Sequence, residues 1–184
     1  MESLQNIKVY KSFLKEEDYK KVLEDTLYSK SWKFGWRSKL NAIQSPPFWK
    51  VELSENSYYN DYLLKYIEEK TGKKFKCLRV YANAKTYGQD GLLHKDHENE
   101  EGKIKYYTFC LYVSPLQNSR FNLIGGELQF KLPELDEDIY ELSILCNPNQ
   151  GVLFPSHYWH RGMSYKRYTH ELRICVAWKL ELLD

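Results

Sequence analysis

The chain has 184 residues, a length that suits one domain built around a single hydrophobic core. Hydrophobic residues make up 42% and aromatic residues 16%, which excludes a disordered chain, and no apolar run approaches the roughly 20 residues of a membrane span. The 27 lysines and arginines nearly balance the 25 acidic residues, so the composition gives no field that favours nucleic acid or an anionic membrane as a partner.

The cysteines lie in apolar stretches and form no CxxC pair. A disulfide framework would show paired spacings in a small secreted chain, and none is present. We therefore expect a cytoplasmic protein with no membrane contact and with four free thiols: Cys77, Cys110, Cys146 and Cys175.

The first 75 residues predict a helical region. Residues 7–10 predict a short strand, and residues 14–28 predict an amphipathic helix. A second apolar stripe at helical spacing covers residues 57–70, and Gly72 follows where a C-terminal cap is expected.

Between the two helices lies an aromatic and polar segment, residues 34–49, which predicts a long loop or irregular strands. Long ordered loops often carry function, so one interpretation is a loop that folds over a substrate. The other interpretation is ordinary packing of its aromatic side chains against the rest of the fold; these are Trp36, Phe48 and Trp49.

The second part of the chain is rich in Tyr, Val, Ile and Phe and is broken by Gly, Pro and Asn, which predicts a run of strands. Their expected positions are 77–82, 92–96, 105–113, 126–130, 151–154 and 171–179.

Two helices followed by a run of strands predict an α+β fold. We expect the helices to buttress one sheet of a β-sandwich or of a double-stranded β-helix, the jelly roll. The chain is predicted to form one domain, residues 1–184, with a helical buttress over residues 1–75 and a jelly-roll core over residues 76–184.

A first metal-binding pattern is His94-Lys95-Asp96. Side chains alternate along a strand, so His94 and Asp96 are expected on the same face, where an imidazole and a carboxylate can hold one ion. The pattern alone is weak, because a surface histidine beside an acid gives the same three letters.

A second pattern is the segment 151–160, in which a predicted strand ends at Pro155 and is followed by two histidines. A distant histidine is what the 2-His-1-carboxylate triad of non-haem iron sites requires. His157 and His160 are three residues apart and face oppositely in an extended segment, so one of them is expected to reach the metal.

Arg173 lies in an apolar predicted strand and is followed on the same face by the small residues Cys175 and Ala177. Burying a guanidinium is costly unless an anion meets it, so Arg173 predicts an anion-binding position. The alternative is an arginine at a strand end that extends its head group into solvent.

Together these residues resemble the 2-oxoglutarate- and Fe(II)-dependent oxygenase superfamily, and most closely its prolyl-4-hydroxylase-like branch. The resemblance covers residues 79–179 and depends on the order and spacing of several segments. They are 79–83 and 87–91 ahead of His94 and Asp96, the strand 107–112, the turn and strand Gly125-Gly-Glu-Leu-Gln-Phe130, and Phe154-Pro-Ser156 ahead of His160.

The resemblance implies that His94, Asp96 and His160 are the metal ligands, and it selects His160 over His157. It also implies that Arg173 binds the far carboxylate of 2-oxoglutarate, and that Tyr112 donates its hydroxyl to the same group. Further side chains that it places at the cosubstrate are Thr108, Leu128, Tyr81 and Asn83.

Two features depart from the family pattern. The interval from His160 to Arg173 is thirteen residues, longer than is common there, and Cys175 replaces a serine two places after the arginine. These departures affect the cosubstrate contacts, where Lys166 or Lys179 is an alternative partner.

The activity implied by the resemblance is a dioxygenase reaction that uses Fe(II), 2-oxoglutarate and O2, with ascorbate as an optional reductant. It hydroxylates a C–H bond and releases succinate and CO2. By analogy with the branch, the expected substrate is a prolyl residue of a peptide or protein; a small molecule or a nucleobase is the alternative within the same chemistry.

Two other classes of protein fit parts of the sequence. A non-catalytic module could bind zinc through four histidines, His94, His97, His157 and His160, although strand alternation places the first two on opposite faces. An interaction domain without metal would leave Asp96, His160 and Arg173 with no shared purpose.

Overall fold

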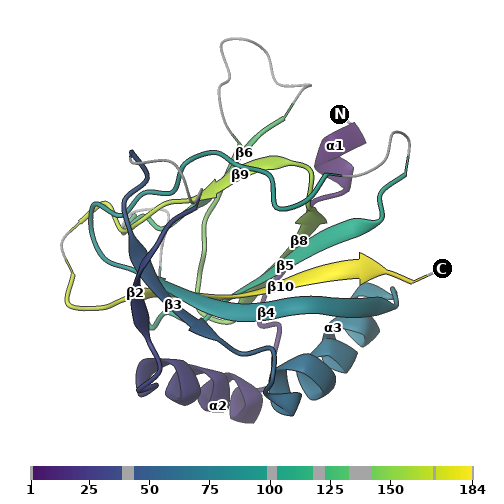
Figure 1. Cartoon of the computed structure of the whole chain (residues 1–184), viewed down its shortest axis with the longest axis horizontal. Helices are drawn as coiled ribbons and strands as arrows, with labels where there is room; N and C mark the ends of the chain where they lie inside the picture. The colour runs from purple at the N-terminus through teal and green to yellow at the C-terminus, as the bar shows by residue number, and fades with distance from the viewer. Residues whose placement is uncertain are drawn as a thin grey trace.

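The computed structural model describes residues 2–38, 44–98, 103–117, 123–132, 142–167 and 169–183. Within them the chain forms two β-sheets, with the longer helices packed against the outer side of the larger sheet (Figure 1). This arrangement confirms the predicted α+β jelly roll.

The larger sheet has seven strands in the order β1–β8–β5–β10–β4–β3–β2, and the smaller sheet has three in the order β7–β6–β9. Every pair of neighbours is antiparallel. The strands of the larger sheet are β1 (Lys8–Tyr10), β2 (Lys33–Trp36), β3 (Phe48–Glu52), β4 (Phe75–Lys85), β5 (Tyr106–Tyr112), β8 (Gln150–Pro155) and β10 (Arg173–Leu182). Those of the smaller sheet are β6 (Leu128–Lys131), β7 (Leu142–Ile144) and β9 (Trp159–Gly162).

The helices lie in the first 75 residues, as predicted, and are α1 (Glu2–Gln5), α2 (Glu16–Leu27), the π-helix η1 (Tyr58–Tyr62) and α3 (Leu63–Thr71). Gly72 ends α3 in the left-handed conformation, with φ 67°, and its N–H bonds to the carbonyl of Glu68 at 2.9 Å. Since β1, β2 and β3 also come from this part of the chain, it supplies strands of the larger sheet as well as helices.

The two sides of the larger sheet differ because side chains alternate along its long strands. On the helix side, Val80 of β4 and Val176 and Trp178 of β10 are buried with Val22 of α2 and Ile67 of α3 in one core. The indole N–H of Trp178 donates to the carbonyl of Tyr59 at 2.9 Å, which ties η1 to the sheet.

A second core lies between the two sheets, where Leu128 and Phe130 of β6 face Val152 and Phe154 of β8. Phe130 and Phe154 meet edge to face with centroids 4.9 Å apart. This core closes one part of the space between the sheets and leaves the rest to polar side chains.

The strand predicted at residues 92–96 is wrong. His94 makes one isolated antiparallel bridge with His160 of β9, whereas the N–H of Asp96 bonds to the carbonyl of Ser156 at 2.9 Å. β7 and β9 were not predicted, because strands of three or four residues show too little periodicity to be detected.

The segment 34–49 contains the end of β2 and the start of β3, which pair with each other. Residues 39–43 lie outside the described part of the chain. The four cysteines are free thiols, three of them buried. None of the helices in the described ranges combines the length and apolar character needed to cross a membrane.

Candidate metal centre

Three predicted ligands converge between the sheets: His94 on the bridge segment, Asp96 two residues later, and His160 on β9. Their ligand atoms all lie within 4.8 Å of one another, and this is the only such group of His, Cys, Asp and Glu within the described residues. The Nε2 atoms of His94 and His160 lie 3.5 and 3.2 Å from the two oxygens of Asp96. Two imidazoles and a carboxylate in this arrangement match a facial triad.

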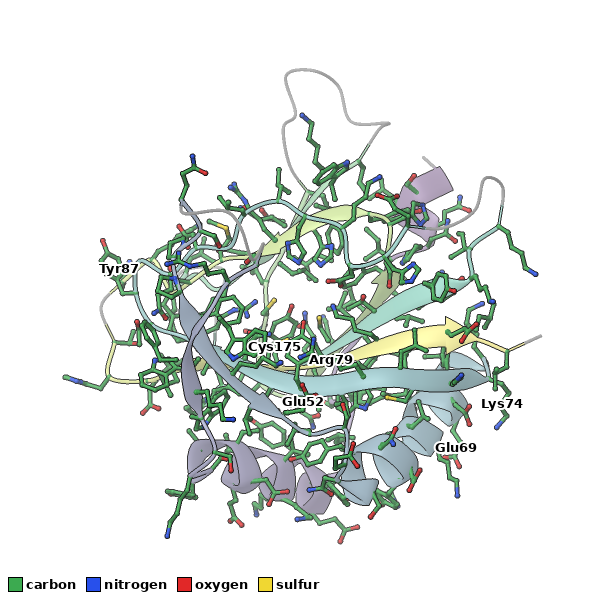
Figure 2. All side chains as sticks on the ribbon, in the orientation of Figure 1. Glu52, Glu69, Lys74, Arg79, Tyr87 and Cys175 are labelled. Atoms are coloured by element: carbon green, nitrogen blue, oxygen red, sulfur yellow. The ribbon has the colours of Figure 1, made fainter. Side chains whose placement is uncertain are left out.

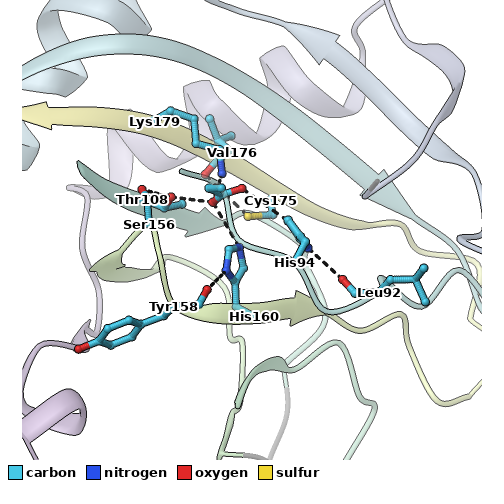
Figure 3. Close-up of polar contacts among 10 residues, drawn as sticks. Leu92, His94, Thr108, Ser156, Tyr158, His160, Cys175, Val176 and Lys179 are labelled. Carbon is cyan, nitrogen blue, oxygen red and sulfur yellow. Dashed lines mark hydrogen bonds and ion pairs between the residues drawn. The ribbon is translucent and has the colours of Figure 1, made fainter. Parts of the chain in front are cut away.

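The backbone fixes which nitrogen each histidine offers. The Nδ1 atom of His94 lies 2.9 Å from the carbonyl of Leu92, and that of His160 lies 2.8 Å from the carbonyl of Tyr158 (Figure 3). A carbonyl accepts only from a protonated nitrogen, so each contact leaves the Nε2 lone pair available to a metal. Desolvation lowers the pKa of the buried His160 imidazole, which keeps it in the neutral form that a metal requires.

Asp96 is surrounded by donors. Thr108 of β5 donates to its Oδ2 at 2.7 Å, and Lys179 of β10 pairs with the same oxygen. Burial opposes ionisation of this carboxyl, but the ammonium of Lys179 outweighs that effect and holds its pKa well below the ordinary value. Asp96 is therefore ionised at neutral pH, the form in which a carboxylate can hold a metal.

The other two histidines of the predicted zinc site, His97 and His157, lie outside this group. The ring of His97 stacks on Tyr106 with centroids 3.7 Å apart, and the ring of His157 meets Tyr158 edge to face. The four-histidine zinc site is therefore wrong, because only His94 and His160 reach a shared centre.

The triad opens into a cavity of about 430 Å³, a size typical of small-molecule sites. Five of the six predicted cosubstrate residues line it: Tyr81, Asn83, Tyr112, Leu128 and Arg173. Thr108 is the exception and corrects the prediction, since its hydroxyl contacts Asp96 and Ser156 rather than the cavity.

Arg173 is 3% exposed and has no carboxylate partner in the described parts of the chain. Its Nε donates to the carbonyl of Gly126 at 3.1 Å, and its terminal nitrogens pass Gly162, where an added Cβ would lie 3.2 Å from Nη2. The ring of Tyr112 lies 5.0 Å from the guanidinium carbon. A buried guanidinium without an acid is costly, which indicates that an anion belongs beside it.

Two buried oxygens in the same cavity lack hydrogen-bond partners among the described residues: the hydroxyl of Tyr112 and Oδ1 of Asn83. Burial raises the pKa of the Tyr112 hydroxyl well above its ordinary value, so this group remains a proton donor. Unpaired polar atoms inside a cavity indicate a polar ligand that satisfies them.

Lys85 was missed by the sequence reasoning. It is the cross-strand partner of Arg173, is 4% exposed, and donates to the carbonyl of Gly162 at 2.7 Å. Desolvation and the neighbouring guanidinium lower the pKa of its amine to about 7. The lysine at the end of an aromatic and alanine-rich strand gave no sequence signal, because its neighbour Arg173 is 88 residues away along the chain but adjacent in the sheet.

The two lysines considered as alternative cosubstrate contacts have different surroundings. Lys179 lines the cavity and pairs with Asp96. Lys166 pairs with Glu127 at 2.7 Å, keeps 58% of its side chain exposed and does not line the cavity, so that alternative is wrong.

In the segment 34–49, Trp36 and Phe48 line the cavity, as do Arg37 and Ser38. Trp49 instead contacts Phe34, with the ring centroids 4.9 Å apart and the ring planes tilted by 51°, and it is 38% exposed. Trp49 therefore packs within the β2–β3 hairpin, while Trp36 and Phe48 form part of the wall around the triad.

The sequence matches no family model and no curated protein. The structure, in contrast, is similar to many solved structures. A prolyl hydroxylase from Trichoplax adhaerens, in complex with a hypoxia inducible factor oxygen degradation domain peptide fragment, superposes with a TM-score of 0.70 at 14% identity over 96% of this chain and 84% of that one.

Two further structures show the same likeness. HygX from Streptomyces hygroscopicus, with nickel, 2-oxoglutarate and hygromycin B bound, gives a TM-score of 0.64 at 11% identity over 98% of this chain and 86% of that one. The viral collagen prolyl hydroxylase vCPH from Paramecium Bursaria Chlorella virus-1, as a 2-oxoglutarate complex, gives 0.62 at 14% identity over 96% of both chains. The chain has the fold of the 2-oxoglutarate- and Fe(II)-dependent oxygenases.

In this oxygenase fold the triad lies on the smaller sheet and the bridge beside it, whereas Tyr112 and Arg173 lie on the larger sheet that faces it. At 11–14% identity the likeness establishes the fold, so the chemistry is argued from the side chains.

Proposed function

We propose that the protein is a dioxygenase that uses Fe(II), 2-oxoglutarate and O2 to hydroxylate a C–H bond, releasing succinate and CO2. One observation carries the proposal: a His-Asp-His triad and a buried arginine without an acid line the same cavity. A metal-binding module would need the first feature alone. An oxygenase of this type needs both, since its cosubstrate is a dianion.

The metal would be held by Nε2 of His94, Nε2 of His160 and a carboxylate oxygen of Asp96. The donor set of two nitrogens and one oxygen suits Fe(II), which supplies the oxygen chemistry when bound. Thr108 keeps Asp96 oriented, and the carbonyls of Leu92 and Tyr158 keep the imidazoles oriented, so the triad requires little rearrangement to bind.

In the proposed complex, Arg173 pairs with the far carboxylate of 2-oxoglutarate, and Tyr112 donates its hydroxyl to the same group. Both side chains are at least 97% buried, so a charge-assisted hydrogen bond here is little screened by water. Leu128, Tyr81 and Asn83 form the remaining wall of the cosubstrate position, and Asn83 offers an unpaired Oδ1.

For the substrate we propose a prolyl residue of a peptide or protein, with ascorbate as an optional reductant. The support is the likeness to the prolyl hydroxylase that was solved with a peptide. A small molecule is the second candidate, because HygX was solved with hygromycin B and has nearly the same coverage. Both candidate substrates would react at the same proposed metal triad.

The test is binding followed by turnover. Without oxygen, 2-oxoglutarate should bind the Fe(II)-loaded protein with a calorimetric signal and a visible charge-transfer absorption. In air, 2-oxoglutarate should be converted to succinate. Asp96→Ala should abolish metal binding, the absorption and succinate formation together.

The matched control is His157→Ala, which removes a histidine three residues from His160 and outside the ligand group. It should bind metal and 2-oxoglutarate as the native protein does. If the metal-loaded native protein fails to bind 2-oxoglutarate, the oxygenase proposal is wrong and a metal-binding module remains.

A further inference from the structure

The cavity has an unusual charge. The whole chain carries 27 basic and 25 acidic residues, yet within the described residues the cavity wall holds many basic side chains and only one acid, Asp96. The basic side chains are Arg37, Lys50, Arg79, Lys85, Lys95, Arg173 and Lys179. Clefts lined by one sign of charge attract ligands of the opposite sign.

Three of these cations surround the ring of Tyr81 and form a group that we name the Tyr81 cluster. Nζ of Lys50 lies 5.3 Å from the ring centroid, the guanidinium carbon of Arg79 lies 5.0 Å from it, and Nζ of Lys179 lies 5.7 Å from it. They come from the neighbouring strands β3, β4 and β10, and Lys179 and Arg79 are direct cross-strand partners.

The cluster has fewer negative than positive charges near it. Arg79 pairs with Oε2 of Glu52 at 2.8 Å (Figure 2). Nζ of Lys50 lies 3.1 Å from the same oxygen. Partial burial disfavours the charge on Glu52, but hydrogen bonds from Arg79, Ser54 and Lys50 overcome this and lower its pKa to about 2. Glu52 therefore neutralises one of the two cations, and one positive charge remains.

Within the cluster, Lys50 is the cation whose burial costs the most free energy. Its residue is 6% exposed, and its ammonium lies 3.7 Å from the ring centroid of Trp36, a cation–π contact that holds it in place. Arg79 keeps 43% of its side chain exposed, so the cluster extends from the buried wall to the cavity mouth. A ligand from solvent can therefore reach it.

The remaining member, Lys179, depends on the metal site. Its ionic partner among the described residues is Asp96, the proposed metal ligand. When Asp96 binds a cation, Lys179 faces that cation, and no other protein carboxylate pairs with it among the described residues. A second anion in the cavity would relieve this repulsion.

2-Oxoglutarate does not balance the whole cluster. Arg173, its proposed anchor, precedes Lys179 by six residues on β10, so the two Cα atoms are about 20 Å apart at ~3.3 Å per residue. A short dianion that spans the metal and Arg173 would bring one carboxylate to the metal, beside Lys179, and would leave the excess charge of Lys50 and Arg79 unbalanced.

We propose that the primary substrate carries a carboxylate that binds Lys50, Arg79 and Lys179 while the carbon to be oxidised faces the metal. This inference rests on the proposed function and names the substrate class of the same site. One carboxylate balances the charge that Glu52 leaves, and the fork of Arg79 suits it. The carboxylate belongs to an acidic residue beside the target residue of a peptide, or to a small carboxylic acid.

The experiment compares acids with their amides. The full chain is loaded with Ni(II), which prevents turnover, and then with 2-oxoglutarate, and each binding step is measured by calorimetry. The probes are acetyl-Pro-Glu-amide against acetyl-Pro-Gln-amide, and N-acetyl-L-proline against N-acetyl-L-prolinamide. A hydrogen bond to a charged group contributes about 1.5–3 kcal/mol. For whichever of the two acids binds more tightly, the dissociation constant should therefore be lower than that of its amide by roughly tenfold or more.

The variants test whether the Tyr81 cluster causes this preference. Arg79→Gln changes a half-exposed side chain and should reduce the preference for the acid, and Lys50→Met should abolish it. Lys76→Gln, an exposed lysine on the same strand and outside the cavity, is the charge-matched control and should leave it unchanged.

Equal binding of acid and amide in both pairs, or no binding of either acid, would overturn the inference. So would an equal effect of Arg79→Gln and Lys76→Gln. If 2-oxoglutarate fails to bind in the first step, the proposed function fails and the inference with it. If 2-oxoglutarate binds but the protein binds each acid no more tightly than its amide, only the inference fails. If the protein prefers the acid in one of the two pairs, that pair identifies the source of the carboxylate.

Discussion

On the helix side of the larger sheet, β4 and β10 present Val80, Val176 and Trp178 to the core formed with the helices. On the opposite side, residues one position away along the same strands present Arg79 and Lys179 to the cavity. Both sets of residues lie on the same two strands, and they face opposite sides of the sheet because successive side chains along a strand alternate. One sheet thus supplies stability through one face and ligand binding through the other.

The two faces affect folding with opposite sign. Burial of apolar surface on the helix side stabilises the fold, by about 1.5–3 kcal/mol for a fully buried large side chain. Buried cations on the cavity side have too few acids nearby and oppose folding until ligands bind. The comparison predicts that substitutions on the two faces change different measurements.

The largest effect is expected on the helix side. Trp178 is 1% exposed and donates to the carbonyl of Tyr59, so Trp178→Ala should lower the free energy of unfolding by about 3–5 kcal/mol. Urea unfolding of the metal-free protein measures this. The affinity of the folded fraction for 2-oxoglutarate should not change. Tyr87→Ala, at a 60% exposed aromatic residue, is the control and should stay within about 0.5 kcal/mol of the native protein.

On the cavity side, Lys85→Met should stabilise the protein. The folded-state pKa of Lys85, about 7, is below the value of 10.5 for an ordinary lysine, so the unfolded chain binds more protons between these pH values. The penalty is fully present below about pH 7 and disappears as the pH approaches 10.5. Each unit of lowering corresponds to about 1.4 kcal/mol.

We therefore expect Lys85→Met to raise the free energy of unfolding by about 2–4 kcal/mol at pH 7, and the advantage to shrink as the pH rises toward 10. Urea unfolding of both proteins at several pH values measures it. The nearby groups that share this environment are Arg173, Asp90 and Cys175. A difference that is independent of pH would show that Lys85 is not buried as an ammonium.

The smallest expected effect concerns the anion anchor. Arg173→Ala should raise the Michaelis constant for 2-oxoglutarate about 10–100-fold, since a hydrogen bond to a charged group contributes about 1.5–3 kcal/mol. Succinate formation at varied 2-oxoglutarate measures this, and Arg173→Lys should give an intermediate value because it keeps the charge and loses the fork. An unchanged Michaelis constant in Arg173→Ala would remove Arg173 from the cosubstrate site.

The sequence predicted the residues of the site better than the elements that carry them. His94 and Asp96 were expected together through the alternation of a strand, but that strand is a single bridge with His160. The two side chains still converge, because the backbone of Asp96 bonds to Ser156 instead of continuing along β9. The pattern His94-Lys95-Asp96 predicted that two side chains would lie close together. The path of the backbone there depends on hydrogen bonds to residues distant in sequence.

The choice of His160 over His157 came from the family resemblance, whereas the patterns of the sequence itself indicated an α+β fold with long strands and singled out His94, Asp96 and Arg173. These features depend on periodicity and on residue types whose burial has few explanations. The tertiary structure decided which side chains share the cavity. Lys85 meets Arg173, and Lys50 and Arg79 meet Lys179, only because β3, β4 and β10 are neighbours in the larger sheet. Strand order is set by long-range pairing and packing, which no local pattern encodes.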